Sequence, residues 1–213
     1  DDRPDIDQFC LTVSPLAKAE TTLRLMKHEG FERVIIFCNT KHMCQRLSDE
    51  FQRAGVDCDC LHGDIRQNQR ERTMQKFRQG KLPVLIATDV ASRGIDVDDV
   101  DCVINYDIPT NNEYYVHRIG RTGRAGKSGA AYTICSGRRQ VYLMQDIAKA
   151  TKSEVIKLEI PTAASILKKQ RLLKQEELIS KMELSEELPY LDVVEELMAQ
   201  GYSAEQIAAA ALG

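Results

Sequence analysis

Short apolar runs alternate along the chain with longer stretches in which apolar residues recur every three or four positions. The short runs predict strands at 9–13, 34–38, 56–61, 84–87, 102–105, 130–134 and 155–158. The longer stretches predict helices at 15–29, 41–54, 67–79, 112–119 and 137–150. Strands that alternate with helices of about 10–15 residues indicate βαβ units and a parallel sheet. Because such crossovers are right-handed, the pattern predicts an α/β domain with a doubly wound parallel sheet.

The pattern changes after Thr162, where strand signals end. One helix is expected from 163 to about 182, and its apolar residues point in several directions, as on a helix packed on more than one side. A second helix carries an apolar stripe, and Ser203 to Gln206 reads as the capping box of a third. We therefore expect two domains, 1–162 and a small all-α domain at 163–213.

Composition narrows the class of protein but does not indicate a ligand. Hydrophobic residues make up 43% of the 213, enough for a sizeable core, and no apolar run approaches the roughly 18 residues of a membrane span. The first residues lack the pattern of a signal peptide, and the abrupt start looks like a cut inside a longer protein. The seven cysteines favour buried, reduced thiols in a cytoplasmic protein, and no zinc-like spacing is present.

Charge is divided unequally between the two expected domains. The whole chain carries a net charge of −3, but residues 163–213 hold five basic and nine acidic side chains, net −4. That leaves +1 for residues 1–162, which is not a basic domain. A site for a polyanion must therefore come from locally placed arginines.

Residues 117–126 concentrate three arginines and three glycines at the end of a predicted helix. Arg121 and Arg124 are spaced i, i+3, so on a helical turn they would share a face, and two guanidiniums on one face suit a polyphosphate. The plainer interpretation is a solvated basic turn. The nearby Gly126-Lys127-Ser128 is not a phosphate-binding P-loop, because Arg121 stands where that motif needs a glycine.

Polar residues also follow several strands, as expected for a sheet whose ligands bind beyond the carboxyl ends of its strands. In the loop 88–96, Thr88 and backbone amides could hold a phosphate, and Asp96 could bind a ribose diol. A turn at 62–64 leads into a helix start with Gln67 and Arg70, a position that favours anions. Each signal alone is weak, since such residues are common after strands and on solvated helix faces.

Taken in order, these segments resemble the second RecA-like domain of DEAD-box RNA helicases, in helicase superfamily 2. Residues 35–40 resemble motif IV, 67–70 the QxxR motif, and 88–96 motif V, with Ser92 where the family usually has alanine. Motif VI, HRIGRTGR, is present without departure at 117–124. The resemblance covers roughly residues 5–160.

The resemblance implies a role for each matched residue. Arg121 and Arg124 would act as arginine fingers on the ATP γ-phosphate, Asp96 would bind the ribose, and His117 would contact the partner domain. The RNA sugar-phosphate backbone would be held by a set of residues from several loops: Thr40, Gly63, Gln67, Arg70, Thr88, Arg93 and Gly94.

The resemblance also implies what is missing. The sequence has no GxxxxGK[ST], no DEAD motif and no Q motif, so the family's first RecA-like domain, which mainly binds ATP and Mg²⁺, is absent from the chain. We expect half of an ATP-dependent RNA helicase, inactive alone, whose partners are RNA and the N-terminal RecA-like domain of the same protein. A non-catalytic RNA-binding, self-associating module is the alternative, and half of a DNA helicase is disfavoured by motifs V and VI.

The tail is similar to the helical dimerisation segment that follows the core in bacterial cold-shock-type DEAD-box proteins. That similarity implies a homodimer formed through 163–213 and a role in the stress response. The alternatives are a helical extension packed on its own core, a flexible arm, or a ubiquitin-associated fold, suggested by the turn between the two short helices.

Overall fold

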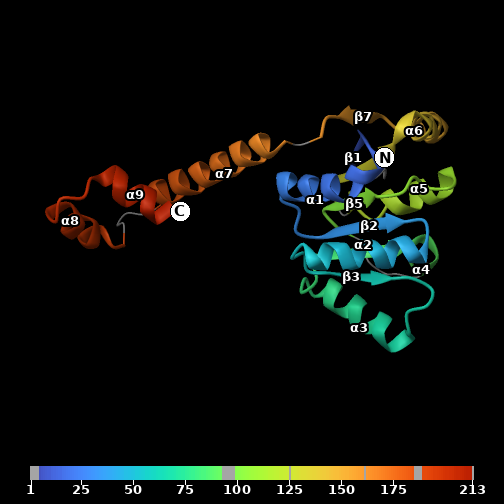
Figure 1. Cartoon of the computed structure of the whole chain (residues 1–213), viewed down its shortest axis with the longest axis horizontal. Helices are drawn as coiled ribbons and strands as arrows, with labels where there is room; N and C mark the ends of the chain where they lie inside the picture. The colour runs from blue at the N-terminus through green and yellow to red at the C-terminus, as the bar shows by residue number, and fades with distance from the viewer. Residues whose placement is uncertain (1–4, 93–98, 125, 161, 185–188, 213) are drawn as a thin grey trace. The chain divides into compact units, whose positions relative to one another are not determined.

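The structure is a computed structural model that describes residues 5–92, 99–124, 126–160, 162–184 and 189–212. The chain divides into two compact units, residues 1–166 and 167–213, which we call the sheet unit and the tail unit (Figure 1). The division falls inside a helix, a few residues after the boundary at 162 and 163 that the sequence suggests.

The sheet unit is built on seven parallel strands in the order β3-β4-β2-β5-β6-β1-β7. Their bounds are β1 Ile6–Val13, β2 Val34–Cys38, β3 Cys58–Leu61, β4 Val84–Thr88, β5 Cys102–Asn105, β6 Gly129–Ser136 and β7 Val155–Leu158. Strands β2, β4 and β5 are buried at every residue because helices cover both faces of the sheet. This confirms the doubly wound parallel sheet.

Helices form one layer on each face. Helices α1 (Lys18–Glu29) and α2 (Lys41–Arg53) share one core cluster with residues of the sheet. Two clusters on the other face contain α3 (Gln67–Arg78), α4 (Asp89–Ser92), α5 (Asn112–Ile119) and α6 (Gly137–Thr151). All seven cysteines are free thiols, and only Cys10 is not fully buried.

Local capping explains where several helices begin and end. The side chain of Thr40 accepts a hydrogen bond from the Met43 backbone amide at 3.1 Å, which caps α2. Gly30 ends α1 in the left-handed conformation, at φ 70°, as expected for a C-terminal cap. The start of α1 differs from the helix predicted at 15–29: Pro15–Ala17 form a 3₁₀ turn, and α1 begins only at Lys18.

The tail unit contains most of α7 (Ala163–Leu184), together with α8 (Leu191–Ala199) and α9 (Ala204–Leu212). Ser203 and Gln206 form the expected capping box, since each side chain bonds the other's backbone amide, at 3.2 and 2.9 Å. None of the described residues of this unit is buried. Among the described residues of the whole chain, no helix is long and apolar enough to cross a membrane.

Candidate functional site

Three of the predicted site residues gather where neighbouring strands end. Thr40 lies two residues beyond β2, Gly63 two residues beyond β3, and Thr88 is the last residue of β4. Because the sheet order is β3-β4-β2, these ends are adjacent at one edge of the sheet, which we call the carboxyl edge. Thr40 and Gly63 are exposed and Thr88 is buried. The sheet therefore brings together three small residues at one edge, of which Thr40 and Gly63 are open to a ligand.

The start of α3 lies at the same edge. Arg70 donates from Nη2 to the carbonyl of Ala91 at 2.5 Å, which ties α3 to α4, the short helix directly after β4. Gln67 is exposed, and its amide donates to Glu71 at 2.9 Å. The structure thus places Arg70 beside the segment after β4, with Gln67 one turn earlier on the same helix.

Three predicted residues of the 88–96 loop, Arg93, Gly94 and Asp96, lie outside the described residues. The expectations for them therefore stay predictions.

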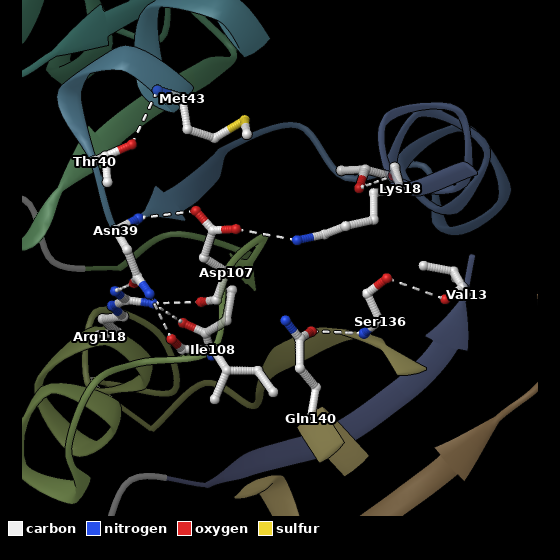
Figure 2. Close-up of polar contacts among 12 residues, drawn as sticks. Val13, Lys18, Asn39, Thr40, Met43, Asp107, Ile108, Arg118, Ser136 and Gln140 are labelled. Atoms are coloured by element: carbon white, nitrogen blue, oxygen red, sulfur yellow. Dashed lines mark hydrogen bonds and ion pairs between the residues drawn. The ribbon is translucent and has the colours of Figure 1, made fainter. Parts of the chain in front are cut away.

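Arg118 of α5 is the largest fully buried side chain of the sheet unit, at 1% exposure. Its guanidinium forms a bidentate ion pair with Asp89, with Nε and Nη2 each 2.6 Å from a carboxylate oxygen. It also donates to Asn39 Oδ1 and to the Asp107 carbonyl, both at 2.8 Å (Figure 2). These partners follow β4, β2 and β5 respectively. One buried cation therefore fixes the ends of three strands.

Asp107 extends this arrangement toward α1. Its carboxylate accepts a hydrogen bond from the backbone amide of Asn39 at 3.0 Å and pairs with Lys18 Nζ at 3.1 Å (Figure 2). Lys18 is only 8% exposed, and its ammonium lies 4.3 Å from the ring centroid of Tyr106. Buried charges are stable only when they are paired in this way. The loop after β2, which carries Thr40, is thereby held rigidly against β5 and α1.

The arginine pair of motif VI, Arg121 and Arg124, lies at the edge of the sheet opposite the carboxyl edge, where the strands begin. The carbonyl of Arg121 accepts from the Val100 amide at 3.2 Å, and Thr122 bonds the carbonyls of Val100 and Asp101, just before β5 begins. The expectation that Arg121 and Arg124 share a helical turn is wrong, because α5 ends at Ile119 and Gly123 has φ 69°. A side chain on Gly123 would lie 2.6 Å from the Asp5 carbonyl oxygen, so close packing on β1 requires glycine and turns the chain.

Both arginines of the pair are nevertheless accessible. Arg124 is exposed and its Nε donates to the Gly120 carbonyl at 2.6 Å, while Arg121 is partly exposed. His117 is also exposed, on α5 one residue before Arg118. Helix α5 therefore connects two regions that the sequence could not place: the strand ends joined by Arg118 and the arginine turn at the other edge of the sheet.

Sequence reasoning singled out two of the three arginines in this motif and passed over Arg118. A signal for it exists, because Tyr115, Arg118 and Ile119 fall on one i, i+3, i+4 stripe of α5, and all three are buried. An arginine on an apolar stripe needs buried acceptors. The residues that follow the strands, Asn39, Asp89 and Asp107, are those acceptors.

One exposed ion pair marks the rim of the carboxyl edge. Lys41 Nζ lies 2.8 Å from Asp64 Oδ2, and this hydrogen bond lowers the pKa of the Asp64 carboxyl from its ordinary value. Within the described residues, no group of three or more histidine, cysteine, aspartate or glutamate side chains could hold a metal ion.

Comparison with known proteins gives the chain's relatives. The family of helicase conserved C-terminal domains matches residues 17–126. The DEAD-box ATP-dependent RNA helicase CshA of Bacillus anthracis is 38% identical over 200 residues, which cover 94% of this chain and 38% of that protein. The ATP-dependent RNA helicase DeaD of Buchnera aphidicola is 41% identical over 172 residues, 81% of this chain and 28% of that protein. The chain therefore spans well under half the length of these two relatives.

Solved structures agree with the sequence relatives. A DEAD box protein from Methanococcus jannaschii is 44% identical, with a TM-score of 0.67 over 72% of this chain and 42% of that one. The Escherichia coli DEAD-box protein SrmB, solved bound to the regulator of ribonuclease activity A, is 32% identical, with a TM-score of 0.68 over 76% of this chain and 95% of that one. The likeness confirms the RecA-like fold of the sheet unit.

Proposed function

The chain belongs to the helicase conserved C-terminal domains of the DEAD-box type, and we propose that it is the C-terminal half of an ATP-dependent RNA helicase. In the whole protein it would supply arginines to ATP and part of the RNA-backbone site, so that ATP hydrolysis drives RNA unwinding or remodelling. The observation that carries this proposal is the arginine turn. Arg121 and Arg124 are accessible; the Arg121 carbonyl accepts from the Val100 amide just before β5, and Arg124 Nε donates to the Gly120 carbonyl.

The two arginines suit phosphoryl transfer because fixed guanidiniums neutralise the charge that develops on the transferred group. The Arg124 guanidinium is already held by the Gly120 carbonyl, which limits the reorganisation that it needs at the reaction step. Asp96 would bind the ribose and His117 would contact the preceding RecA-like domain. ATP and Mg²⁺ would be held mainly by that domain, whose motifs this sequence does not contain.

The carboxyl edge suits an RNA backbone for a different reason. Thr40, Gly63 and Thr88 present small side chains at adjacent strand ends, while Gln67 and Arg70 border them with polar and basic groups. Contacts of this kind position a sugar-phosphate backbone and carry no base information. Each phosphate neutralised by a cation contributes about 0.7 to the salt slope on single strands, so we expect weak, salt-sensitive binding by this chain alone.

The decisive experiment is an ATPase assay on a polypeptide that joins the preceding RecA-like domain to this chain. We expect RNA-stimulated turnover from the joined protein and none from the chain alone. Replacing Arg121 by alanine in the joined protein should lower turnover roughly 10³-fold or more, the scale of arginine fingers. Arg139→Ala, on the exposed side of α6, is the matched control and should leave turnover unchanged. RNA-stimulated ATPase from the chain alone would refute the assignment of roles.

The competing proposal is a non-catalytic module that binds RNA and associates with itself. A protein that only binds RNA has no use for ligands of a γ-phosphate, and the intact arginine pair therefore favours the helicase. If the joined polypeptide binds RNA but neither binds nor hydrolyses ATP, the module is the correct alternative.

We further propose that residues 163–213 form a homodimer. Eleven large apolar side chains of these residues are at least 41% exposed: Leu167, Leu172, Leu173, Ile179, Met182, Tyr190, Leu191, Val193, Met198, Tyr202 and Leu212. So small a helical unit is marginal alone, and two copies about a two-fold axis would cover these faces. Because the match to the Bacillus CshA takes in 94% of the chain, it includes most of this segment, which supports a shared architecture.

A further inference from the structure

A pocket of about 400 Å³ opens at the carboxyl edge between the start of α1 and the first turns of α2. Its lining includes Tyr106, directly after β5, and Ser136, the last residue of β6. Strands β5 and β6 lead to helices on the other face, so no helix from them fills the space between α1 and α2. Ligands of doubly wound sheets bind where neighbouring strands diverge in this way. None of the residues assigned above to ATP or to the RNA backbone lines this pocket.

The hydroxyl of Tyr106 is a polar group of this pocket to which the described residues give no hydrogen-bond partner. Tyr106 is 6% exposed, and its hydroxyl makes no hydrogen bond within the described residues, whereas the buried Tyr115 donates to Gln8 at 2.8 Å. Burial raises the pKa of Tyr106 to about 12, with smaller effects from neighbouring charges that include Glu50 and Arg46. Tyr106 itself lines the pocket together with Glu50 and Arg46, so its hydroxyl is the group that we assign to a ligand.

The charges around the pocket cancel. Lys18 is paired with Asp107 at 3.1 Å, and Arg46 and Glu50 lie one turn apart on α2. A bound phosphate would therefore gain little here, in contrast to the arginine turn. The charge balance instead favours a neutral ligand.

The walls of the pocket divide into apolar sides and polar ends. Met43 and Leu47 of α2 face Leu16 and Ala19 across the opening, and Leu16 is 99% exposed. Gln140 accepts from the Ser136 backbone amide at 2.6 Å through its oxygen, which leaves its amide nitrogen free to donate (Figure 2). Apolar sides combined with hydrogen-bonding groups suit an unstacked nucleobase, which has apolar faces and polar edges.

The pocket is also next to a residue of the proposed RNA-backbone site. Met43 is three residues after Thr40, and the two are joined by the capping hydrogen bond at the start of α2 (Figure 2). The Thr40 hydroxyl accepts that bond, so its proton is free to reach a phosphate. A nucleotide whose backbone lies on Thr40 can direct its base between α1 and α2.

We propose that this pocket binds one unstacked nucleobase of the single-stranded RNA whose backbone Thr40 holds, an inference that rests on the proposed RNA binding. Binding that tolerates most sequences would then include one position where the base matters. Its hydrogen bonds would come from Tyr106 and Gln140, and its faces would pack on Met43 and Leu16.

The test is a double-mutant cycle between protein and RNA, measured by fluorescence anisotropy at low salt with the full chain. A labelled eight-nucleotide RNA is compared with eight variants that each lack one base. We expect base removal at one position to weaken wild-type binding roughly tenfold, the scale of one stacked base. Tyr106→Phe should weaken binding of the intact RNA about threefold, as for one hydrogen bond, and should not affect the RNA that lacks that base.

Controls distinguish the base pocket from the proposed RNA binding on which it rests. Tyr142→Phe, an exposed tyrosine of α6 outside the pocket, should change nothing, and Arg70→Ala should weaken all nine RNAs alike. If every single-base removal has the same effect in wild type and Tyr106→Phe while RNA still binds, the base pocket is wrong, RNA binding stands, and a peptide or small metabolite becomes the candidate ligand. If the wild-type chain binds none of the RNAs, both proposals are overturned.

Discussion

In the sheet unit, β2, β4 and β5 are buried along their whole length, whereas no described residue of the tail unit is buried. Both regions are rich in apolar residues, so composition does not explain the contrast. The sheet is covered by a helix layer on each face, while the short helices α8 and α9 leave an apolar groove of about 470 Å³ between them. One region completes its core within a single chain, and the other presents surface that a second molecule could cover.

Removal of the tail unit should have the largest effect on the contrast between the two units. We expect the full chain to scatter light as a dimer and a chain ending at Thr162 to have the mass of a monomer, since the covering surface would be lost entirely. Leu173→Glu, at a side chain of α7 that is 55% exposed, should have the same effect, and Lys168→Glu, at an exposed polar position of that helix, should not. A mass near 24.0 kDa for the full chain at micromolar concentration would mean that the tail does not pair.

The buried ion pair of the sheet unit provides the next largest effect. Arg118→Ala should lower the free energy of unfolding of the sheet unit by about 3–5 kcal/mol, because it leaves Asp89, whose side chain is only 14% exposed, charged and without its cation. Urea unfolding followed by circular dichroism measures the change. Arg139→Ala, at an exposed position, should stay within about 0.5 kcal/mol of wild type. Similar values for the two variants would show that the network around Arg118 does not hold the strand ends.

Alkaline pH should affect the stability of the sheet unit through its cysteines and not that of the tail unit, because every cysteine lies in the sheet unit. Burial raises the pKa of Cys58 to about 11 and that of Cys135 to about 12, against about 8.5 in an unfolded chain. The folded state therefore keeps these protons, and the stability it gains is present below about pH 8.5 and lost as pH rises toward 11.

At pH 8 the difference in cysteine pKa between the folded and the unfolded chain also predicts slow alkylation of the folded protein. Because far less thiolate is present, Cys58 should be alkylated roughly 200-fold more slowly in the folded chain than in urea, and Cys135 roughly 2,000-fold more slowly, as measured residue by residue by mass spectrometry. The unfolded chain is the internal control. Equal rates in the two states would mean that the sheet unit opens readily.

The smallest expected effect tests the tail's own stability. Ser203→Ala removes the cap of α9 and should cost about 1 kcal/mol, without changing the unfolding of the sheet unit. Ser180→Ala, exposed within α7, serves as the control. If the tail is stable only in a dimer, the melting temperature of the Ser203→Ala variant by circular dichroism should fall as protein concentration is lowered.

Much of the fold could be predicted because local pattern and tertiary structure agree in the core. The bounds of β5, α5 and β7 coincide with the apolar runs that predicted them. The prediction for β1 was too short because Asp7 and Gln8 are polar, yet pairing with β6 extends the strand to Ile6. Strand length at a mixed segment is decided by the partner strand, which the local sequence does not contain.

The sequence predicted the position of site residues only where they lie at or directly after the ends of strands. Thr40, Gly63 and Thr88 were expected at one edge because parallel strands end together. The position of Arg121 depends on how far the chain runs back across the sheet after Ile119, and that distance is set by contacts with Val100 and Asp5. The role of Arg118 depends on three loops distant in sequence, so spacing within its own motif could not reveal it.

The position of β1 has a consequence for synthesis on the ribosome. This strand is made first among those of the chain, but it lies between β6 and β7, and Val13 pairs with Ser136, 123 residues later. At about 5–20 residues per second, the first strand waits roughly 6–25 s for its neighbour. During that interval its unpaired edge needs shielding, from a chaperone or from other parts of the growing chain, because an open strand can pair with the wrong partner.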